Sequence, residues 1–336
     1  MNRSLGRTNR RIQHQVLAAL LGCAEMSLFA SAVRAQDPPG TAIPLADVEL
    51  DESKLRVHFI DIGPGLAMLI ETPGDRRHIF IDGGKWGLDG LQSYLERFVH
   101  DVTSSGFSAR PIDAAIVTHA DSDHYKGLSR LLKNNFRVGE FWYTGYESDE
   151  LDEIQGWGEL LKKIEAMEGC EVYVPIGDYV DAGDREVLDD GGTPDDASDD
   201  VIVQYLNVDA DPPERDPVFG RRFSESQRRN NASLVLKIIY GDVSFLVTGD
   251  INGRNKDHKA ASTDNEIDSE ELELWVRHTL DPDRYGLKAT VLPAPHHGSN
   301  GSCSLPFLKA VDPEWVVITA GHQFNHPHPA ALRRIR

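Results

Sequence analysis

Short hydrophobic runs separated by turns open the folded part of the chain. Residues 55–62 alternate between apolar and polar side chains, and a Gly-Pro-Gly turn ends this run. Residues 67–71 and 78–81 are two further short runs, each followed by turn-forming residues. Alternation bounded by Gly and Pro is typical of β-strands joined by tight turns. The pattern predicts a β-meander whose third strand ends at Asp82.

Helices and strands alternate after the meander. Residues 91–100, 128–132 and 156–167 carry apolar side chains at helical spacing. The apolar runs at 114–118 and 141–143 are short enough to be buried strands. This order predicts strands of a sheet that is covered by helices.

A similar order returns in the second half of the chain. Apolar runs at 233–239 and 243–248 flank a Tyr-Gly-Asp turn and predict a hairpin. A helix is predicted at 270–280, with strands at 289–292 and 315–319. The repeated order predicts an α/β sandwich of two similar halves, in which helices cover paired sheets.

An acidic stretch separates the two halves. Residues 181–229 contain a run of Asp, Gly, Thr and Pro at 189–196, followed by two more aspartates. Clustered carboxylates suit calcium, but the spacing does not match an EF-hand loop. We therefore interpret 181–229 as a solvated insertion in a domain that spans 54–336. Residues 36–53, rich in Pro and Asp, are predicted to be a linker.

The first 35 residues have the organisation of a signal peptide. Four arginines precede an apolar segment at 16–22, and Ala35 ends a small-residue cleavage site. A lipobox that ends in Cys23 is the alternative and would give a lipid anchor at that residue. An amphipathic N-terminal helix is a third interpretation. The signal peptide and the lipobox both predict export to the periplasm or the extracellular space.

Composition narrows the classes of partner. The 336 residues carry a net charge of −19, which disfavours a broad grip on long nucleic acid or anionic membrane. Loss of residues 1–35 would remove five Arg and one Glu, so the exported chain would be more acidic still. No later run is apolar and long enough to span a bilayer. Cys170 and Cys303 offer one disulfide in an oxidising compartment.

The chemistry concentrates in one loop after a predicted strand. His119, Asp121, Asp123 and His124 fall within six residues, directly after the apolar run that ends at Val117. Imidazole and carboxylate are the usual ligands of zinc and its first-row neighbours. Alternation places the first three on one side of an extended segment, and a helix that begins near His124 turns its ring back. Such density predicts a site for two ions.

Other predicted strands also end in polar side chains. Because sites in α/β sheets gather at one edge of the strands, we expect these residues to converge on the loop. Asp250, from the second half, would then bridge two ions with its two oxygens. The strand-end residues are Asp61, Asp82, Asp250, His296, His297, His326 and His328.

These motifs resemble those of the metallo-β-lactamase superfamily, and within it the hydrolase domain of ComEC-type DNA-uptake proteins without their membrane channel. The resemblance covers about residues 55 to 333 and implies a four-layer αββα sandwich. It also implies a dinuclear site, with zinc as the first candidate and manganese or iron as alternatives. The motifs are Val57–Gly65, Ile81–Gly84, Thr118–His124, Asn230–Ser233, Phe245–Asp250, Pro295–Ser299 and Asn325–Pro327.

Two positions depart from most of the superfamily. Asp121 stands where most members have His, and Asn230-Asn231 stands where a middle His ligand is expected. Both departures are typical of the ComEC-like subgroup and imply that one ion is bound less tightly. Pro64 and Leu66 replace residues common in the opening loop of the subgroup, so the substrate is left open.

The residues and the resemblance together predict a metal-dependent hydrolase. Asp123 would bind a metal and orient the attacking water, while His326 or His328 would bind a substrate anion or protonate a leaving group. Asn231 and Ser233 would support the pocket by hydrogen bonds, or serve only to enter the hairpin.

A phosphodiesterase acting on a small or short phosphodiester is the preferred function. A nuclease is the most specific version of this hypothesis. Charge disfavours long nucleic acid as its substrate. A lactonase or β-lactamase is the enzymatic alternative. A non-catalytic binding or accessory protein with a vestigial metal site is the alternative from another class.

Overall fold

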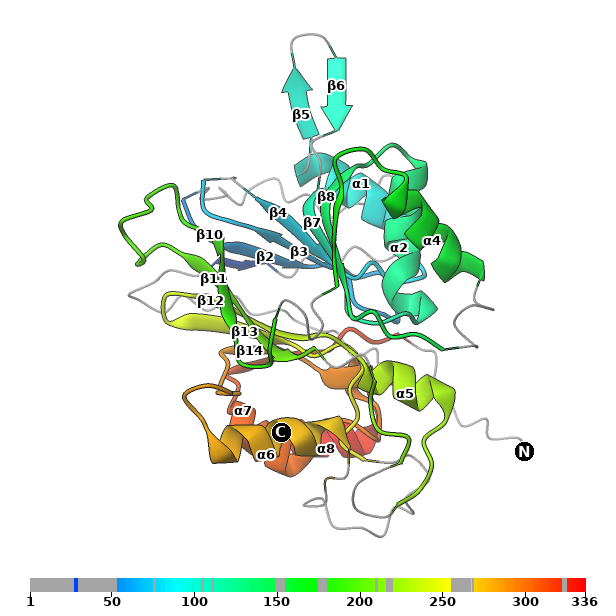
Figure 1. The fold of residues 1–336 in the computed structure, drawn as a ribbon, viewed down its shortest axis with the longest axis vertical. Helices are drawn as coiled ribbons and strands as arrows, with labels where there is room; N and C mark the ends of the chain where they lie inside the picture. Colours follow the sequence, from blue (N-terminus) through cyan, green and yellow to red (C-terminus); the bar gives the residue numbers. More distant parts are fainter. Residues whose placement is uncertain are drawn as a thin grey trace, which may run out of the picture.

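Two mixed β-sheets form the centre of the computed structural model (Figure 1). The structure describes residues 27–29, 53–74, 77–98, 100–103, 106–109, 112–148, 155–174, 180–208, 211–215, 220–254, 267, 269–321 and 325–336. Among these residues, no helix has the length and the apolar content to cross a membrane.

The first sheet contains the predicted meander and the strands that follow it. Its meander strands pair antiparallel, and the strands after β4 pair parallel. In spatial order the strands are β1 (Ser27–Phe29), β2 (Arg56–Phe59), β3 (Met68–Glu71), β4 (His78–Ile81), β7 (Ile112–Val117), β8 (Val138–Tyr143) and β9 (Glu171–Tyr173).

The edge strand β1 lies within the segment predicted to be a signal peptide. It pairs parallel with β2, so cleavage after Ala35 would leave β2 at the edge of the sheet. The rest of the predicted signal peptide and almost all of the linker lie outside the described residues. Both therefore stay predictions.

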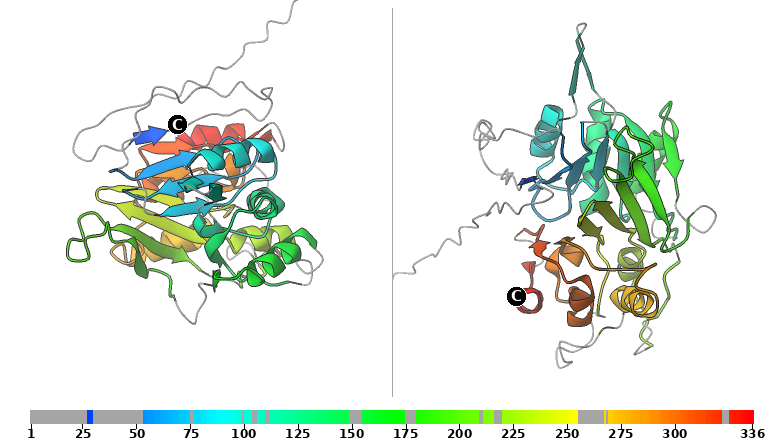
Figure 2. Two further views of the ribbon diagram at one scale, coloured as in Figure 1. Left: turned by 90° about the horizontal axis from the view of Figure 1, so that it is seen from above. Right: turned by 90° about the vertical axis from the view of Figure 1, so that its left-hand side faces the viewer.

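Helices cover the outer face of the first sheet. They are α1 (Leu88–Phe98), α2 (Ser122–Lys133) and α4 (Gln155–Glu165), close to the ranges that helical spacing predicts. A small hairpin, β5 (His100–Thr103) and β6 (Gly106–Ala109), projects from this end of the molecule (Figure 2).

The second sheet corrects the prediction of one long insertion. Two of its six strands lie inside 181–229, and helix α5 (Glu225–Asn231) begins there as well. The acidic run at 189–196 is thus only the connection between two paired strands. In spatial order the strands are β10 (Arg185–Asp189), β11 (Val201–Asn207), β12 (Val235–Tyr240), β13 (Val243–Val247), β14 (Val291–Pro293) and β15 (Trp315–Val317).

A second helical layer covers the outer face of this sheet (Figure 1). It consists of α6 (Glu270–Leu280), α7 (Leu305–Val311) and α8 (Pro329–Ile335). A 3₁₀ turn, η1 (Pro295–Gly298), follows β14 and carries the predicted histidine pair.

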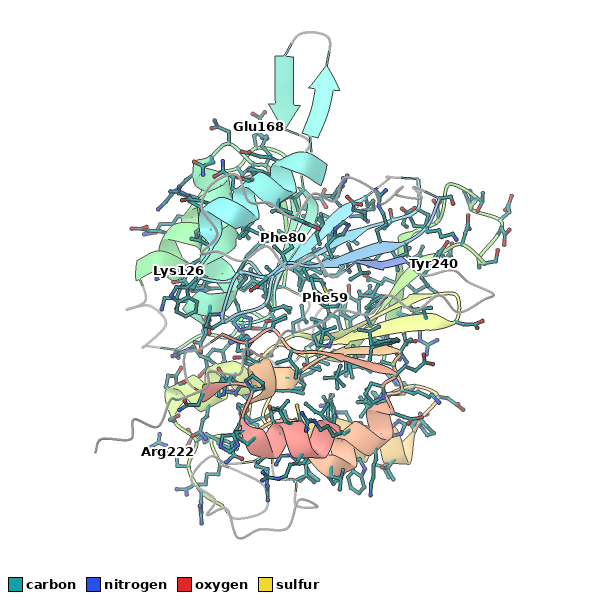
Figure 3. The ribbon with its side chains drawn as sticks, turned by 180° about the vertical axis from the view of Figure 1, so that it is seen from behind. Phe59, Phe80, Lys126, Glu168, Arg222 and Tyr240 are labelled. Atoms are coloured by element: carbon teal, nitrogen blue, oxygen red, sulfur yellow. The ribbon has the colours of Figure 1, made fainter. Side chains whose placement is uncertain are left out.

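Three apolar clusters fill the spaces between the four layers. Phe80 packs between the first sheet and its helices, whereas Phe59, two strands away, packs between the sheets (Figure 3). The third cluster joins the second sheet to its helices and includes Phe307. The αββα sandwich that the sequence predicts is confirmed.

Cys170 and Cys303 are both free thiols. Cys303 is buried under the second helical layer, whereas Cys170 is half-buried on the side of the first sheet. The disulfide considered between them is therefore wrong for this fold.

Candidate metal centre

The loop after β7 places two histidines in the interior. Thr118 through Ala120 leave the strand, and α2 begins at Ser122. His119 and His124 are both buried, at 2% and 0% exposure. Asp121 occupies the position before the helix, but its side chain makes no capping hydrogen bond. The carboxylate of Asp121 is thus available for other partners.

Close approach of the backbone lets α2 begin beside the end of β4. A Cβ added to Gly127 would lie 1.9 Å from the carbonyl oxygen of Gly83, so only glycine fits there. Asp82, at the end of β4, accepts a hydrogen bond from Nδ1 of His124 at 2.8 Å. It also accepts from the backbone and hydroxyl of Thr118. Asp82 therefore fixes the His124 ring with Nε2 directed away from it.

The second sheet contributes one central carboxylate. Asp250 follows β13 and is 4% exposed. Its backbone N–H donates to Oγ of Ser233 at 3.1 Å. Gly249 precedes it with φ +53, and a Cβ there would meet Ser233 and Thr118 within 3 Å. The tight turn at Gly249 thus brings Asp250 against the loop of the first sheet.

The histidine pair lies in an unusual backbone conformation. His296 and His297 have φ values of 47° and 54°, in the left-handed region that costs energy for residues other than glycine. The side chain of His297 is 6% exposed and that of His296 is 26% exposed. Nδ1 of His296 is 3.0 Å from Oδ1 of Asn252.

Four imidazoles surround the carboxylate of Asp250. Its Oδ1 lies 3.2 Å from Nε2 of His124 and 3.4 Å from Nε2 of His297. Its Oδ2 lies 3.7 Å from Nε2 of His296 and 3.9 Å from Nε2 of His119. The two oxygens thus face different histidines, as a bridging carboxylate requires.

The ring nitrogens that face Asp250 fit metal ligation better than hydrogen bonding. Within the described part of the chain, Nε2 of His119, His124 and His297 makes no hydrogen bond, although each is buried. Two ligands about 2.1 Å from one tetrahedral ion are about 3.4 Å apart, close to the separations seen here. A buried donor without a partner costs free energy, so a cation between these atoms would satisfy them.

Two overlapping groups of ligand atoms are compact enough for an ion. His119, His124 and Asp250 form one, and Asp123, His124 and His297 form the other, with ligand atoms within 4.8 Å of one another. A cavity of about 10 Å³ beside His124, Asp250 and His297 has room for a single small occupant. Sequence analysis left His296 and His297 undistinguished, and the geometry favours His297.

Burial and the facing charges shift the titration of the cluster. Burial opposes the charged form of Asp250, but His297 and His124 outweigh it and lower the pKa of this carboxyl well below its usual range. Burial and His124 lower the pKa of His119 well below its usual value. Burial also lowers the pKa of His124, yet Asp250 and Asp82 raise it well above the ordinary value. The surroundings thus favour the charged forms of Asp250 and His124 and the neutral form of His119.

Asp121 has partners that sequence analysis missed. Nε of Arg229, on α5, donates to its Oδ1 at 2.7 Å. Burial raises the pKa of Asp121, and Arg229 opposes that rise. Oδ2 of Asp121 lies 3.9 Å from Nε2 of His119. Arg229 precedes Asn230-Asn231 directly, and that adjacency was the only signal in the sequence.

Three other predicted residues surround the cluster without facing Asp250. Asn231 is buried, and its Oδ1 accepts from Asn252 at 3.3 Å. Ser233 contacts the turn of Asp250 through its hydroxyl. The ring of His326 lies 5.7 Å from that of His296, centroid to centroid, and burial lowers its pKa to about 4.

Two predicted site residues have local structural roles instead. Asp61 is exposed, and its Oδ1 accepts from the backbone of Gly63 at 3.0 Å, which closes the opening turn. His328 caps α8, since its Nδ1 accepts from the backbone of Ala330. The side chain of Asp61 is engaged in the turn, and that of His328 is engaged in the helix cap. Within the described part of the chain, neither is seen to contact the histidines around Asp250.

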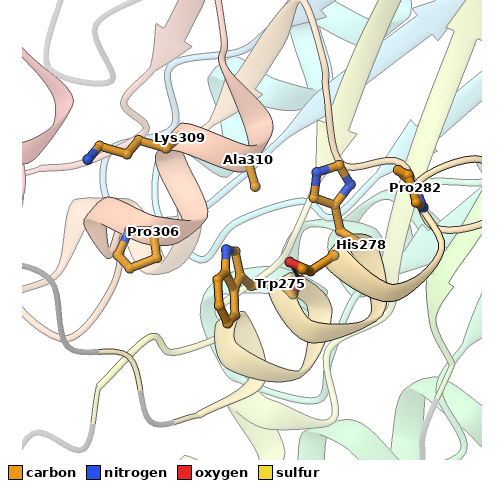
Figure 4. Close-up of a pocket in the computed structure, with 7 residues that line it drawn as sticks. Trp275, His278, Pro282, Pro306, Lys309 and Ala310 are labelled. Atoms are coloured by element: carbon orange, nitrogen blue, oxygen red, sulfur yellow. Dashed lines mark hydrogen bonds between the residues drawn. The ribbon is translucent and has the colours of Figure 1, made fainter.

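A larger cavity of about 500 Å³ lies in the helical layer, away from this chemistry (Figure 4). Trp275 and His278 of α6 face Pro306 and Lys309 of α7 across it. Among the described residues that line it there is no carboxylate, so they do not supply the ligand set of the centre at Asp250.

The family model of the metallo-beta-lactamase superfamily matches residues 60–322 of this chain. ComE operon protein 3 of Bacillus subtilis (strain 168) is 25% identical over 296 residues, which are 84% of this chain and 31% of that protein. Competence protein ComA of Neisseria gonorrhoeae is 22% identical over 289 residues, 85% of this chain and 30% of that protein. The chain thus spans about a third of the length of these relatives.

Solved structures also resemble the chain. The metallo-beta-lactamase fold protein YhfI from Bacillus subtilis aligns over 83% of this chain and 91% of its own, with 11% identity and a TM-score of 0.43. The short form of human tRNase Z aligns over 80% of this chain and 93% of its own, with 14% identity and a TM-score of 0.38.

Proposed function

Because the chain belongs to the metallo-β-lactamase superfamily, we propose that it is a hydrolase that uses two divalent ions to cleave phosphodiesters. The observation that carries the proposal is Asp250, whose two oxygens face separate histidines. The Nε2 atoms of these histidines make no hydrogen bond to any residue that the structure describes. Zinc is the first candidate because its protein ligands are imidazole and carboxylate, with manganese and iron as alternatives.

Two bound ions would supply Lewis acidity, activating a water and stabilising negative charge on a phosphoryl group. The protein places the groups around that chemistry. His119 and Asp250, with Asp121, would bind one ion. His124, His297 and Asp123 would bind the other together with Asp250. Asp82 keeps the His124 ring oriented through its hydrogen bond to Nδ1.

Asp123 has the most direct role in the reaction. Its side chain is 22% exposed, and Oδ2 lies 3.9 Å from Nε2 of His297. One carboxylate oxygen can therefore face the ion while the other accepts a hydrogen bond from the attacking water. That orientation directs the water towards the substrate and takes up its proton.

His326 is assigned to substrate binding. It lies beside His296, near the exposed edge of the cluster. A ring whose pKa is about 4 is neutral at pH 7, so it can donate an N–H to a substrate oxygen but is a poor proton source. Of the two roles that the sequence left open for His326, we therefore favour binding of the substrate over protonation of a leaving group.

The choice of a phosphodiester rests on the resemblance of the motifs to the ComEC-type subgroup, and a competence protein is among the relatives. The net charge of −19 favours a small or short substrate over long nucleic acid. A lactone or β-lactam is the second candidate, because the same ligands can activate water for attack on a carbonyl.

The test is hydrolysis of bis-p-nitrophenyl phosphate by protein whose metal content is measured on the same sample. We expect close to two equivalents of metal, and Asp123→Asn should lower turnover at least ~10²-fold. Asp89→Asn, at an exposed position on α1, is the matched control and should leave turnover unchanged. Wild-type protein that opens lactones or β-lactams but cleaves no phosphodiester would contradict the substrate class. Protein that binds two ions but hydrolyses none of these would support an accessory role.

We also propose that the protein is exported. The basic and apolar segments within residues 1–35 support this. Intact-mass analysis of protein from its native host should show a start at Gln36, or a lipid-modified Cys23. An unprocessed chain in the cytosol would contradict export.

A further inference from the structure

Helix α5 reaches the metal-binding loop from a distant part of the chain. Nε of Arg229 donates to Oδ1 of Asp121 at 2.7 Å, and their side chains are 13% and 21% exposed. A capping box between Ser224 and Gln227 fixes the beginning of this short helix. The Arg229–Asp121 contact is therefore a largely buried pair between two ordered elements.

Asn230 reaches the same carboxylate. In the amide orientation that satisfies both of its polar atoms, its nitrogen donates to Oδ2 of Asp121 at 3.1 Å and to the carbonyl of Ser226 at 3.0 Å. Two consecutive residues of α5 therefore contact the two oxygens of Asp121. A carboxylate oxygen accepts more than one contact, so Oδ2 can still face a cation.

The preceding arginine has a different environment. Nη2 of Arg228 pairs with Asp211, whose side chain is 92% exposed, and its guanidinium lies over the ring of Tyr146. Arg228 thus offers a control with the same charge, on the same helix, directed away from Asp121.

The two oxygens of Asp121 have separate environments. Oδ1 is bound by Arg229, while Oδ2 faces Nε2 of His119 at 3.9 Å. The same nitrogen lies 3.9 Å from Oδ2 of Asp250. Nε2 of His119 therefore has one carboxylate oxygen from each half of the centre at the same separation.

We propose that Arg229 is a positioning residue that directs Asp121 into the His119–Asp250 half of the metal centre and balances its charge. The inference rests on the proposed metal dependence. A planar guanidinium with a fixed N–H direction sets the rotamer of a carboxylate, which a flexible ammonium does not. Without it, Asp121 would add a further negative charge beside Asp123 and Asp250 in a buried site. Arg229 contacts Asp121, and Asp121 faces His119, so we expect its effect to fall on the ion of that half.

Metal binding to chelator-treated protein tests this inference by calorimetric titration with Mn²⁺. Loss of an outer partner of a metal ligand typically costs 10–100-fold in affinity. We expect Arg229→Gln to weaken one of two binding events by that factor and to leave the other within about twofold. Arg228→Gln should leave both events unchanged. If Arg229→Gln does not fold, Arg229→Lys carries the test, since it keeps the charge but loses the planar donor. It should weaken the same event.

A double-mutant cycle separates positioning from a general structural effect. Asp121→His supplies a neutral ligand that cannot pair with a guanidinium. Adding Arg229→Gln to Asp121→His should therefore have no further effect on Mn²⁺ affinity, whereas independent roles would give additive losses.

The outcomes distinguish the two proposals. Two unchanged binding events in Arg229→Gln, or additive losses in the cycle, would overturn the role of Arg229 and leave the metal centre intact. A parent chain that binds no Mn²⁺ and no Zn²⁺ would contradict the proposed function itself.

Discussion

The two sheets contribute to the metal centre in different ways. The first sheet supplies His119 and Asp121 from the loop after β7, and Asp123 and His124 from the first turn of α2. None of these four residues is among those with a positive φ. Local geometry is enough to bring these side chains together.

The second sheet supplies Asp250, His296 and His297 from two separate loops. The two histidines have left-handed backbone conformations, which persist only when surrounding contacts impose them. Asn252 contacts His296 through its side chain. The two residues after Asn252 donate their backbone N–H groups to the carbonyl of Gly301. Glu271, wholly buried, accepts from the backbones of Cys303 and Ser304 in the next segment. Distant residues thus fix this half.

The comparison shows which half is robust to local change. In the first half, a single substitution alters a ligand but leaves the strand and the helix in place. In the second half, the ligands depend on a network of hydrogen bonds, so remote substitutions reach them. Asp250 faces histidines of both halves with each of its two oxygens.

Asp250→Asn breaks the comparison most directly, because it removes the shared carboxylate. An amide is a weak ligand, so both groups should lose their ions and turnover should fall by at least ~10³-fold. Elemental analysis should find well under one metal equivalent. Retention of two equivalents would show that the halves bind ions independently of Asp250.

Substitution of the two adjacent histidines sharpens the comparison within the second half. His297 is buried, with Nε2 3.4 Å from one oxygen of Asp250, whereas His296 is more exposed, with Nε2 3.7 Å from the other oxygen. His297→Ala should weaken metal binding by about 10²-fold and His296→Ala by about tenfold or less. Equal losses in the two titrations would mean that both rings are ligands.

The pH dependence tests how the halves share His124. Its pKa is raised well above 6.5 because Asp250 and Asp82 outweigh burial, so an ion must displace a proton. Apparent affinity for Zn²⁺ should rise by up to about tenfold per pH unit above neutrality.

The stability of the metal-free protein should fall as the pH rises, whereas the affinity for Zn²⁺ rises. A raised histidine pKa contributes stability that is complete below pH 6.5 and is lost as the pH rises through the folded pKa. Thermal unfolding in chelator should therefore occur at lower temperature at pH 9 than at pH 7, whereas the zinc-loaded protein should change less. Affinity that is flat from pH 6 to pH 9 would argue against a proton on His124.

His328→Ala gives the smallest expected effect and tests whether a second histidine at the end of the chain belongs to the centre. Since His328 caps α8, its loss should cost about 1 kcal/mol of unfolding free energy and leave turnover unchanged. A large loss of turnover with unchanged stability would show that His328 has a role in the centre.

The sequence predicts the first half of the centre better than the second. The loop at His119–His124 follows an apolar strand, so spacing alone brings its ligands together. Neither the left-handed turn that separates the roles of His296 and His297 nor the link from Arg229 to Asp121 has a local signal. Both depend on chain segments that only the fold brings into contact.

Elements with strong periodicity were predicted close to their observed bounds, such as the helix at 270–280. The strands β10 and β11 were missed because acidic turn residues surround them and dominate the composition. Once Tyr205 and Val203 pack between the sheets, tertiary burial outweighs that local signal.

The position of Asp250 between the sheets has a mechanical consequence. An ion shared by residues of both halves is a removable cross-link, which closes the large loop of chain between His124 and His297. Such closure restricts the open states in which the sheets separate while each sheet stays paired. Metal supply would then set how often the interface between the sheets opens, and with it the exposure of the protein to proteases.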